Sequence, residues 1–380
     1  MKILYISTTL ELGGAEAVAV AMAEHAKLKW GWTVEYVSLM PGGDRQSALK
    51  EAGIPTHCLG LNRGIPNPQA VVRLAKIIRD FKPDLIHSHM LHSNLIAQLH
   101  RAIFGGPPLI STSHSVDEIR GRKPLAWMHR MGRSQSALTT NICEAGTHNL
   151  IAHRLSLPEK TICVPNGIQL EKFRNSAAAR STTRQKLGLT DSFTFIAIGR
   201  HEPPKDIPCL IDSFATVLQE RPDTILLYVG DGTGRDSTEK EIASRGLRDS
   251  FKILGSRRDI RELLAASDAF VMSSAWEGLP MVLLEAGASG LPLISTNVGG
   301  TAEIVVAEKA GYLVAPRRPD LLAGAMIRMI DLPSENRLEM GTASRQHVAA
   351  NFDADVISAR WYEIYTGLVS SAAHPANERI

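Results

Sequence analysis

The sequence predicts an α/β protein built from two doubly wound parallel sheets. Three observations support this prediction. Short apolar runs alternate with helix-length segments, the alternation starts afresh near residue 193, and 380 residues are enough for two domains. Ligands of such sheets bind beyond the carboxyl ends of the strands, so the residues at those ends are the candidate functional residues.

The first half of the chain contains six expected strands. The strands are short and are separated by helix-length segments, which is the pattern of a parallel, doubly wound sheet. They lie at residues 3–7, 33–39, 84–88, 109–113, 137–141 and 161–164. One helix is expected at residues 15–28. A second helix starts at Asn67 and Pro68, which supply an N-cap and a first-turn proline, and reaches Phe81.

The second half repeats this pattern of strands and helices. Five strands are expected, at residues 193–198, 224–229, 251–254, 269–272 and 292–296. Pro280 precedes a run of good helix formers at residues 281–289. The last helical stretch, residues 354–368, carries apolar side chains at helical spacing and therefore needs a second surface to cover them.

The domain boundaries follow from these elements. The polar stretch at residues 175–184 interrupts the pattern and is the expected hinge. We therefore expect a first domain, a linker, a second domain, a C-terminal helix and a flexible tail, at residues 1–174, 175–190, 191–352, 353–369 and 370–380.

Charge is spread unevenly along the chain. The formal net charge of +3 gives no indication of an extended nucleic-acid surface. Residues 1–170 hold 18 Lys and Arg against 12 Asp and Glu, whereas the remainder holds 24 against 27. A basic first half fits an anionic acceptor or an anionic membrane surface, although scattered surface charge gives the same count.

Cysteine usage and hydropathy indicate the compartment. The four cysteines are far apart with no paired spacing, which disfavours a zinc site and fits a reducing cytosol. No run approaches the roughly 20 apolar residues of a membrane span, and the first residues read as a strand without a signal-peptide cleavage region. We therefore expect a cytoplasmic protein.

The most informative stretch, residues 273–292, joins an expected strand to an expected helix. Glu277 lies in the loop just before the helix, where free amides and the helix dipole favour a bound anion. Glu285 lies inside the helix, where it can accept hydrogen bonds from hydroxyls. Gly278 lets the backbone come close to a ligand. The alternative is an ordinary strand-to-helix crossover with surface glutamates.

Two other loops carry features of a phosphate site. Gly13 and Gly14 lie where the first strand gives way to the first helix, so amides there can approach a diphosphate, although a glycine pair is also a plain turn. Arg200 and Lys205 flank a double proline and can clamp a diphosphate from two sides, unless the loop is simply solvated. The absence of a Gly-x-Gly-x-x-Gly fingerprint after the first strand counts against a dinucleotide-dependent dehydrogenase.

Histidines gather at the ends of two neighbouring strands. His87, His89 and His92 could form a metal site or line the rim of a cleft. Because they have no nearby acidic or thiolate partners, we expect no metal. His114 ends the next strand and points towards the same edge, with a purely structural histidine as the alternative.

The central stretch resembles the Glu-x7-Glu motif of the retaining nucleotide-sugar glycosyltransferases of family 4, which belong to the two-domain GT-B group. Glu277 and Glu285 match the two glutamates, and Gly278, Leu279 and Pro280 match the residues between them. The resemblance covers nearly the whole chain. It implies two Rossmann-like domains that face a central cleft, with a C-terminal helix that crosses back to the first domain.

The resemblance also implies roles for individual residues. It assigns catalysis to Glu277, His114, Arg200 and Lys205. It assigns donor binding to Gly13, Gly14, Arg200, Lys205, Ser256, Arg257, Glu277, Gly278, Leu279, Pro280 and Glu285. In this assignment Glu277 contacts the donor sugar, Glu285 holds the ribose, and Ser256 lies near the base. Asp206 replaces the glycine that usually follows the lysine, which leaves the shape of that loop open.

The expected function is therefore transfer of a sugar, with retention, from a nucleotide diphosphate donor to a hydroxyl. The Gly-Gly-Ala-Glu form of the first motif suggests a UDP-sugar, and a glycan, a lipid-linked glycan or a small molecule would be the acceptor. We expect no metal cofactor and no nucleic-acid partner, and a peripheral contact with the inner face of an anionic membrane is a further option. A GT-B sugar-nucleotide epimerase and a non-catalytic sugar-nucleotide binder are the alternatives.

Overall fold

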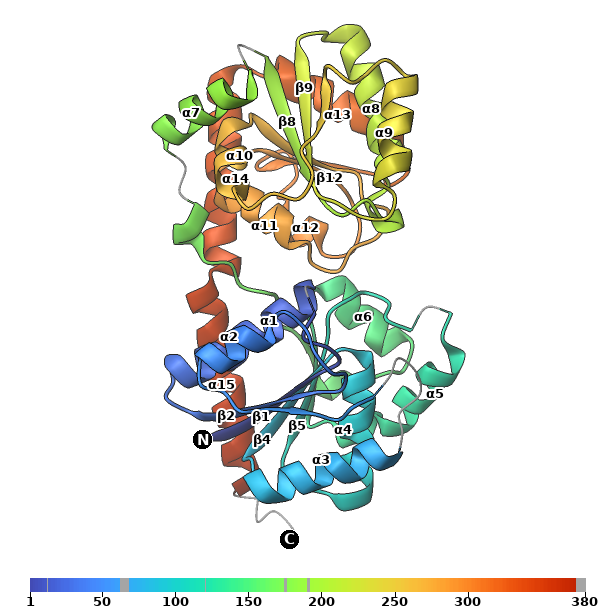
Figure 1. The fold of residues 1–380 in the computed structure, drawn as a ribbon, viewed down its shortest axis with the longest axis vertical. Helices are drawn as coiled ribbons and strands as arrows, with labels where there is room; N and C mark the ends of the chain where they lie inside the picture. The colour runs from blue at the N-terminus through green and yellow to red at the C-terminus, as the bar shows by residue number, and fades with distance from the viewer. Residues whose placement is uncertain (12, 62–67, 120, 174–175, 190–191, 374–380) are drawn as a thin grey trace. The chain divides into compact units, whose positions relative to one another are not determined.

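The chain folds into two compact units, and the computed structural model describes residues 1–380 except 12, 62–67, 120, 174–175, 190–191 and 374–380 (Figure 1). Unit 1 comprises Met1–Pro165 together with the chain from Ala359 onward, and unit 2 comprises Asn166–Ser358. Each unit contains one parallel sheet with helices on both faces (Figure 1). The predicted pair of doubly wound α/β sheets is thereby confirmed.

Unit 1 has a seven-stranded sheet in the order β3-β2-β1-β4-β5-β6-β7. Its strands are β1 (Lys2–Ser7), β2 (Thr33–Ser38), β3 (Thr56–Cys58), β4 (Leu85–His89), β5 (Leu109–Ser113), β6 (Leu138–Asn141) and β7 (Thr161–Cys163). Its helices are α1 (Gly14–Leu28), α2 (Gln46–Glu51), α3 (Pro68–Phe81), α4 (Leu91–Phe104), α5 (Lys123–Gly132), α6 (Glu144–Ala152) and most of α15 (Ala354–Ala373). The strand order reverses beside β1, which is where ligands of doubly wound sheets bind.

The two faces of β1 are buried against different partners. Leu4 and Ile6 belong to an apolar cluster with Leu74 of α3 and Ile96 of α4. On the opposite face the Tyr5 hydroxyl lies 3.2 Å from the Tyr365 hydroxyl of α15. The sheet of unit 1 therefore supplies the second surface that the apolar spacing of the last helix required.

Unit 2 has a six-stranded sheet in the order β10-β9-β8-β11-β12-β13. Its strands are β8 (Phe193–Ile198), β9 (Thr224–Val229), β10 (Phe251–Ile253), β11 (Ala269–Met272), β12 (Leu293–Thr296) and β13 (Gly311–Val314). Its helices are α7 (Ala177–Leu187), α8 (Ile207–Glu220), α9 (Arg235–Ser244), α10 (Ile260–Ala266), α11 (Met281–Ala288), α12 (Thr301–Ile304), α13 (Pro319–Asp331) and α14 (Ser334–Phe352). Phe195, Phe214 and Phe251 lie in its core.

The structure corrects the expected linker and tail. Residues 175–190 contain helix α7, in which the Ser176 hydroxyl caps the helix by accepting a hydrogen bond from the Ala179 amide at 3.0 Å. The helix is polar because Arg180 and Arg184 bond to Asp268 of unit 2 instead of filling the core. Residues 370–373 of the expected tail lie in α15, and the rest of it lies outside the described residues.

Candidate functional site

The loop between β11 and α11 fixes the Glu277 carboxylate by two contacts. Lys205 Nζ lies 2.6 Å from Glu277 Oε1, and the Ser274 hydroxyl donates to the same oxygen at 2.7 Å. The side chains of Lys205 and Glu277 are only 21% and 14% exposed, so this ion pair is better shielded than a surface pair. Leu279 is buried and Pro280 is the N-cap residue of α11, which starts at Met281.

The glycine turn after β12 braces the same loop. Gly299 has a φ of 55°, and a Cβ there would overlap with the Glu277 carbonyl. The Gly300 amide donates to the Gly278 carbonyl at 2.7 Å. These contacts show that the turn supports the backbone around Glu277.

The loop after β8 carries the expected diphosphate clamp. Pro203–Lys205 forms a short 3-10 helix, and Asp206 follows with a φ of 44°. Asp206 thus adopts the left-handed conformation that glycine favours, so the substitution keeps the loop shape. Arg200 is exposed, and among the described residues its guanidinium has no ion-pair partner. One cation of the clamp is therefore held by a carboxylate, and the other is open to solvent.

Glu285 lies in α11, as expected, with part of its surface exposed. Burial raises the pKa of the Glu285 carboxyl to about 7. Ionisation of this carboxyl therefore takes place near neutral pH.

A pocket of about 770 Å³ opens beside the ends of β8 and β9. It brings Arg200, Ser256 and Arg257 together, whereas Lys205, Glu277 and Glu285 do not line it. Arg257 Nε donates to Asp259 Oδ1 at 2.7 Å, and its Nη2 lies 2.5 Å from Oδ2. The Asp259 carboxylate therefore takes up two of the hydrogen-bond donors of the guanidinium.

In unit 1, Gly13 is the N-cap residue of α1 and Gly14 begins the helix. The Thr9 hydroxyl donates to Glu16 Oε1 at 2.8 Å. A Cβ at Gly13 would overlap with the Glu16 carboxylate, so a side chain there would displace this contact. The first-turn amides of a helix lack partners within the helix, which makes this end suitable for an anion.

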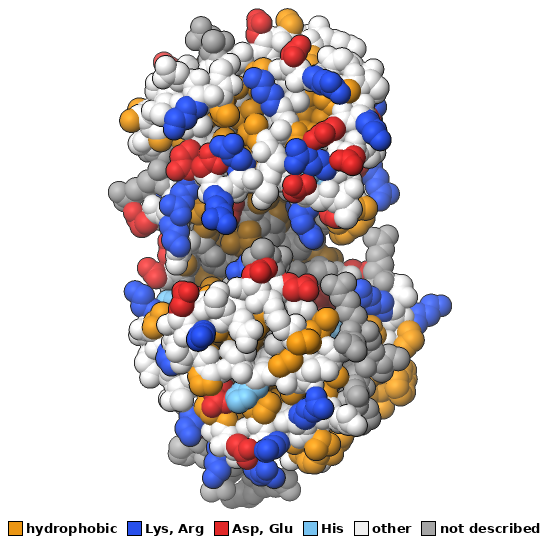
Figure 2. All heavy atoms as spheres, in the orientation of Figure 1, with side chains coloured by type: hydrophobic (Ala, Val, Ile, Leu, Met, Phe, Trp, Pro, Cys, Tyr) orange, Lys and Arg blue, Asp and Glu red, His pale blue; other side chains and the backbone are white. Residues whose placement is uncertain are grey.

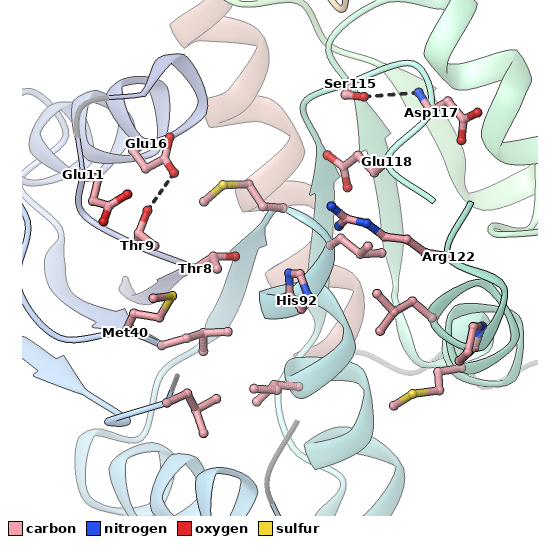
Figure 3. A pocket seen from close by; sticks show the side chains of 18 residues that line it. Thr8, Thr9, Glu11, Glu16, Met40, His92, Ser115, Asp117, Glu118 and Arg122 are labelled. Atoms are coloured by element: carbon pink, nitrogen blue, oxygen red, sulfur yellow. Dashed lines mark hydrogen bonds between the residues drawn. The ribbon is translucent and has the colours of Figure 1, made fainter. Parts of the chain in front are cut away.

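A larger pocket of about 970 Å³ lies next to this helix end in unit 1. Figure 3 shows Glu118 and Arg122 beside each other on one wall, Thr8 and Thr9 on the opposite wall, and His92 between the walls. Glu118 and Arg122 belong to no motif of the sequence. The feature of the sequence that indicates them is the polar stretch after β5, because ligands of doubly wound sheets bind beyond the carboxyl ends of the strands.

Glu118 is tied to the end of β5. Its carboxylate accepts hydrogen bonds from the His114 amide at 2.7 Å and from the Ser113 hydroxyl at 3.3 Å. Burial raises the pKa of Glu118 to about 7, against the lowering effect of these hydrogen bonds and of the Arg122 charge. A carboxyl that titrates near neutral pH thus lines the pocket.

The structure corrects the idea that the histidine group lines a rim. His87 and His89 are fully buried, and only His92 of that group reaches the pocket. The two ring nitrogens of His87 lie 2.6 Å from the Tyr365 hydroxyl and 2.6 Å from the Thr112 hydroxyl. In the part of the chain that the structure describes, no group of three His, Cys, Asp or Glu side chains is placed to hold a metal ion.

His114 pairs with a second histidine at the end of the sheet. Its Nε2 lies 3.0 Å from His89 Nδ1. Burial lowers the pKa of His114 to about 4, and burial also brings the pKa of His89 well below its usual value. Both rings are therefore neutral at pH 7 and act through hydrogen bonds rather than through charge.

Among the residues that the structure describes, no helix is both long and apolar enough to cross a bilayer.

Two solved structures share this fold over nearly the whole chain. HepE from Anabaena, in complex with UDP, has a TM-score of 0.85 at 23% identity and covers 97% of this chain and 100% of its own. The lipopolysaccharide outer core galactosyltransferase WaaB, in its apo form, has a TM-score of 0.76 at 18% identity, with 97% and 100% covered. At these identities the likeness concerns the fold alone.

Sequence comparisons identify the family. A UDP-Gal:alpha-D-GlcNAc-diphosphoundecaprenol alpha-1,3-galactosyltransferase of Escherichia coli is 29% identical over 290 residues, which are 73% of this chain and 74% of that protein. A GDP-mannose-dependent monoacylated alpha-(1-6)-phosphatidylinositol monomannoside mannosyltransferase of Corynebacterium glutamicum is 34% identical over 208 residues, 52% and 54% of the two chains. The model Glycosyltransferase Family 4 matches residues 12–172, and Glycosyl transferases group 1 matches residues 179–347. These matches span most of the chain, and the protein therefore belongs to the group 1 glycosyltransferases of family 4, with the GT-B fold.

Proposed function

We propose that this glycosyltransferase moves a sugar, with retention of its anomeric configuration, from a UDP-sugar to a hydroxyl of a lipid-linked glycan. The observation that carries the proposal is the loop pair of unit 2. There Lys205 holds the Glu277 carboxylate at 2.6 Å, while Arg200 remains exposed and without an ion-pair partner among the described residues. This arrangement offers positive charge to a diphosphate and a carboxylate to a sugar.

Charge development during transfer explains why both groups are needed. Cleavage of the anomeric bond leaves negative charge on the diphosphate and positive charge on the sugar. In the proposal Arg200 and Lys205 stabilise the diphosphate, with a second anion site at the α1 amides near Gly14 in unit 1. Glu277 stabilises the positive charge of the sugar, so a divalent metal ion is not needed for either task.

The remaining residues bind and orient the donor. Glu285 accepts hydrogen bonds from the ribose hydroxyls, and these bonds are stronger when its carboxyl is ionised. Ser256 and Arg257 line the pocket after β8 and β9 and lie near the base. His114, which is neutral at pH 7, donates or accepts a hydrogen bond beside the sugar.

The relatives support UDP as the nucleotide more than GDP. HepE has been crystallised with UDP and with UDP-glucose, and the name of the Escherichia coli relative specifies UDP-Gal. The corynebacterial relative is named as GDP-mannose-dependent, so GDP-sugars belong in any test.

The acceptor side of the proposal rests on unit 1. Its pocket of about 970 Å³ is large enough for a sugar and combines polar groups such as Glu118 and Arg122 with apolar ones such as Leu125 and Met128. Both relatives named above act on lipid-linked acceptors according to their names. Four free cysteines fit a reducing compartment, so we propose a cytoplasmic protein at the inner face of a membrane.

Incubation with a panel of UDP- and GDP-sugars tests the proposal against its alternatives. Each donor is added with and without an acceptor made of GlcNAc linked to a polyprenyl diphosphate. Release of free UDP that depends on the acceptor supports a transferase. A new sugar nucleotide without acceptor would instead indicate an epimerase, and binding without turnover would indicate a non-catalytic binder.

A further inference from the structure

Helices α4 and α5 of unit 1 carry large hydrophobic side chains on their outer faces. Trp127 and Met131 of α5 are 62% and 67% exposed, and Ile103 and Phe104 at the end of α4 are 58% and 55% exposed. The two helices contact each other. Figure 2 shows hydrophobic side chains over α5 at the right-hand edge of the view, with basic side chains beside them. We call this the α4–α5 surface, made of Leu99, Ile103, Phe104, Lys123, Trp127, Arg130 and Met131.

Helical spacing sorts the side chains of α5 onto two faces. One face carries four of these residues, because the last three lie four, seven and eight positions after the first: Lys123, Trp127, Arg130 and Met131. All four are exposed. The other face is used differently, because Ala126 and His129 are buried there while Leu125 and Met128 line the pocket of unit 1. One helix thus connects the exposed surface to the proposed acceptor pocket.

The surrounding sequence contains almost no negative charge. Residues 85–143 include two acidic residues, Asp117 and Glu118, and both line the pocket. Arg130 Nε donates to the His153 carbonyl at 3.0 Å rather than to a carboxylate. Within the described residues neither Lys123 nor Arg130 has a carboxylate partner at ion-pair distance. The α4–α5 surface therefore keeps its positive charge.

This combination of side chains selects one kind of partner. Exposed aromatic and aliphatic groups beside uncompensated cations are typical of surfaces that bind anionic membranes. A second copy of the chain would bring like charges together at a symmetric contact, which costs free energy. By contrast, the equally exposed Leu338 of α14 lies next to Glu339 and close to Glu335, so it shows no such pattern.

We propose that the α4–α5 surface rests on an anionic lipid bilayer, with Trp127, Met131, Ile103 and Phe104 in the headgroup layer and Lys123 and Arg130 on lipid phosphates. The bilayer would then hold a lipid-linked acceptor close to the pocket that Leu125 and Met128 line. This inference deepens the proposed function and rests on it for the acceptor. Binding to the bilayer itself needs neither donor nor acceptor, so it can be measured separately.

Cosedimentation of the full-length protein with lipid vesicles tests the proposal. The vesicles consist of phosphatidylcholine alone or of phosphatidylcholine mixed with phosphatidylglycerol. Binding should require phosphatidylglycerol and should weaken as salt is raised, because screening reduces the attraction. Lys123→Glu should lower the partition coefficient at least about fivefold, the effect of removing one basic residue from the membrane surface.

Matched variants separate this effect from loss of folding. A negative residue at position 123 favours folding, because Lys123 is the first residue of α5 and a carboxylate there complements the helix dipole. Trp127→Ser with Met131→Ser should also reduce binding, whereas Leu338→Ser and Lys240→Glu on exposed positions of unit 2 should not. Thermal unfolding monitors the fold of each variant.

Three outcomes would overturn the proposal. They are equal binding to both kinds of vesicle, unchanged binding of the Lys123 and Trp127 variants, and a dimer in light scattering that these variants disrupt. Failure of the proposed function would look different, because it would leave vesicle binding intact while no donor is turned over.

Discussion

Replacement of Lys205 and of Arg200 by alanine should have the same effect on turnover and different effects on stability. Both variants remove a positive charge from the diphosphate in the proposed mechanism. Only Lys205 also neutralises a shielded carboxylate, because its Nζ lies 2.6 Å from Glu277 Oε1. Arg200 is exposed and has no ion-pair partner in the described part of the chain, so it is the matched control.

The expected magnitudes follow from this geometry. Loss of one group that stabilises developing charge costs about 2–4 kcal/mol in the transition state, which lowers turnover roughly 30- to 1000-fold in each variant. Lys205→Ala leaves Glu277, only 14% exposed, with the Ser274 hydroxyl as its described partner. Leaving a shielded carboxylate without its partner should lower the free energy of unfolding by about 1–3 kcal/mol, and the melting temperature by about 2–10 °C. For Arg200→Ala we expect a change within about 0.5 kcal/mol.

Turnover is measured as UDP released from donor and acceptor, and stability as the unfolding transition in calorimetry. Wild-type turnover in both variants would refute the clamp. Equal melting temperatures for the two variants would refute the structural role of the Lys205 to Glu277 ion pair, even if both lost activity.

Three further predictions concern other residues. Glu277→Gln should lower turnover while UDP binds nearly as well, whereas Glu285→Gln should weaken UDP binding by about 1–3 kcal/mol. Kinetics measure the first effect and calorimetry with UDP the second, and the reverse pattern would mean that the two roles are exchanged. The pKa values of Glu118 and Glu285 are raised from 4.5 to about 7 in the folded state, so the free energy of unfolding should fall as pH rises through this interval. Glu118→Gln should make the melting temperature depend less on pH over this range. An unchanged pH dependence in thermal unfolding would contradict the burial of this carboxyl. Asp206→Gly should raise stability by about 0.5–1 kcal/mol with full activity, because Asp206 has a φ of 44° and makes no side-chain capping bond; a loss of stability in denaturant titration would show that its side chain matters.

All eleven expected strands are present within one or two residues of their expected ends. The nine interior strands are all among them, and each alternates with a helix-length segment, which is the pattern that predicts a parallel sheet. The two that were missed, β3 and β13, are edge strands of three and four residues. Strand β3 is Thr-His-Cys, so it lacks the apolar run that marks a buried strand. Polarity similarly concealed helix α7, whose arginines bond to Asp268 rather than to solvent.

The site was predictable where a motif lies on consecutive residues. Lys205 and Glu277 are far apart in the sequence, and each was found through its own loop, but their direct contact could not be read from either. The burial of His87 and His89 was also hidden, because a sequence does not say which side chains of a strand α15 will cover. Glu118 belongs to no motif, and only the fold brings it into the pocket.

The anomeric configuration of the product shows whether the protein transfers a sugar with retention. The wild-type protein is incubated with an α-linked UDP-sugar and a polyprenyl-diphosphate-linked GlcNAc acceptor, and the new glycosidic bond is assigned by proton NMR. We expect an α-linked product that forms together with free UDP and is lost in Glu277→Gln. A β-linked product, or UDP-sugar consumption without any new glycosidic bond, would contradict it.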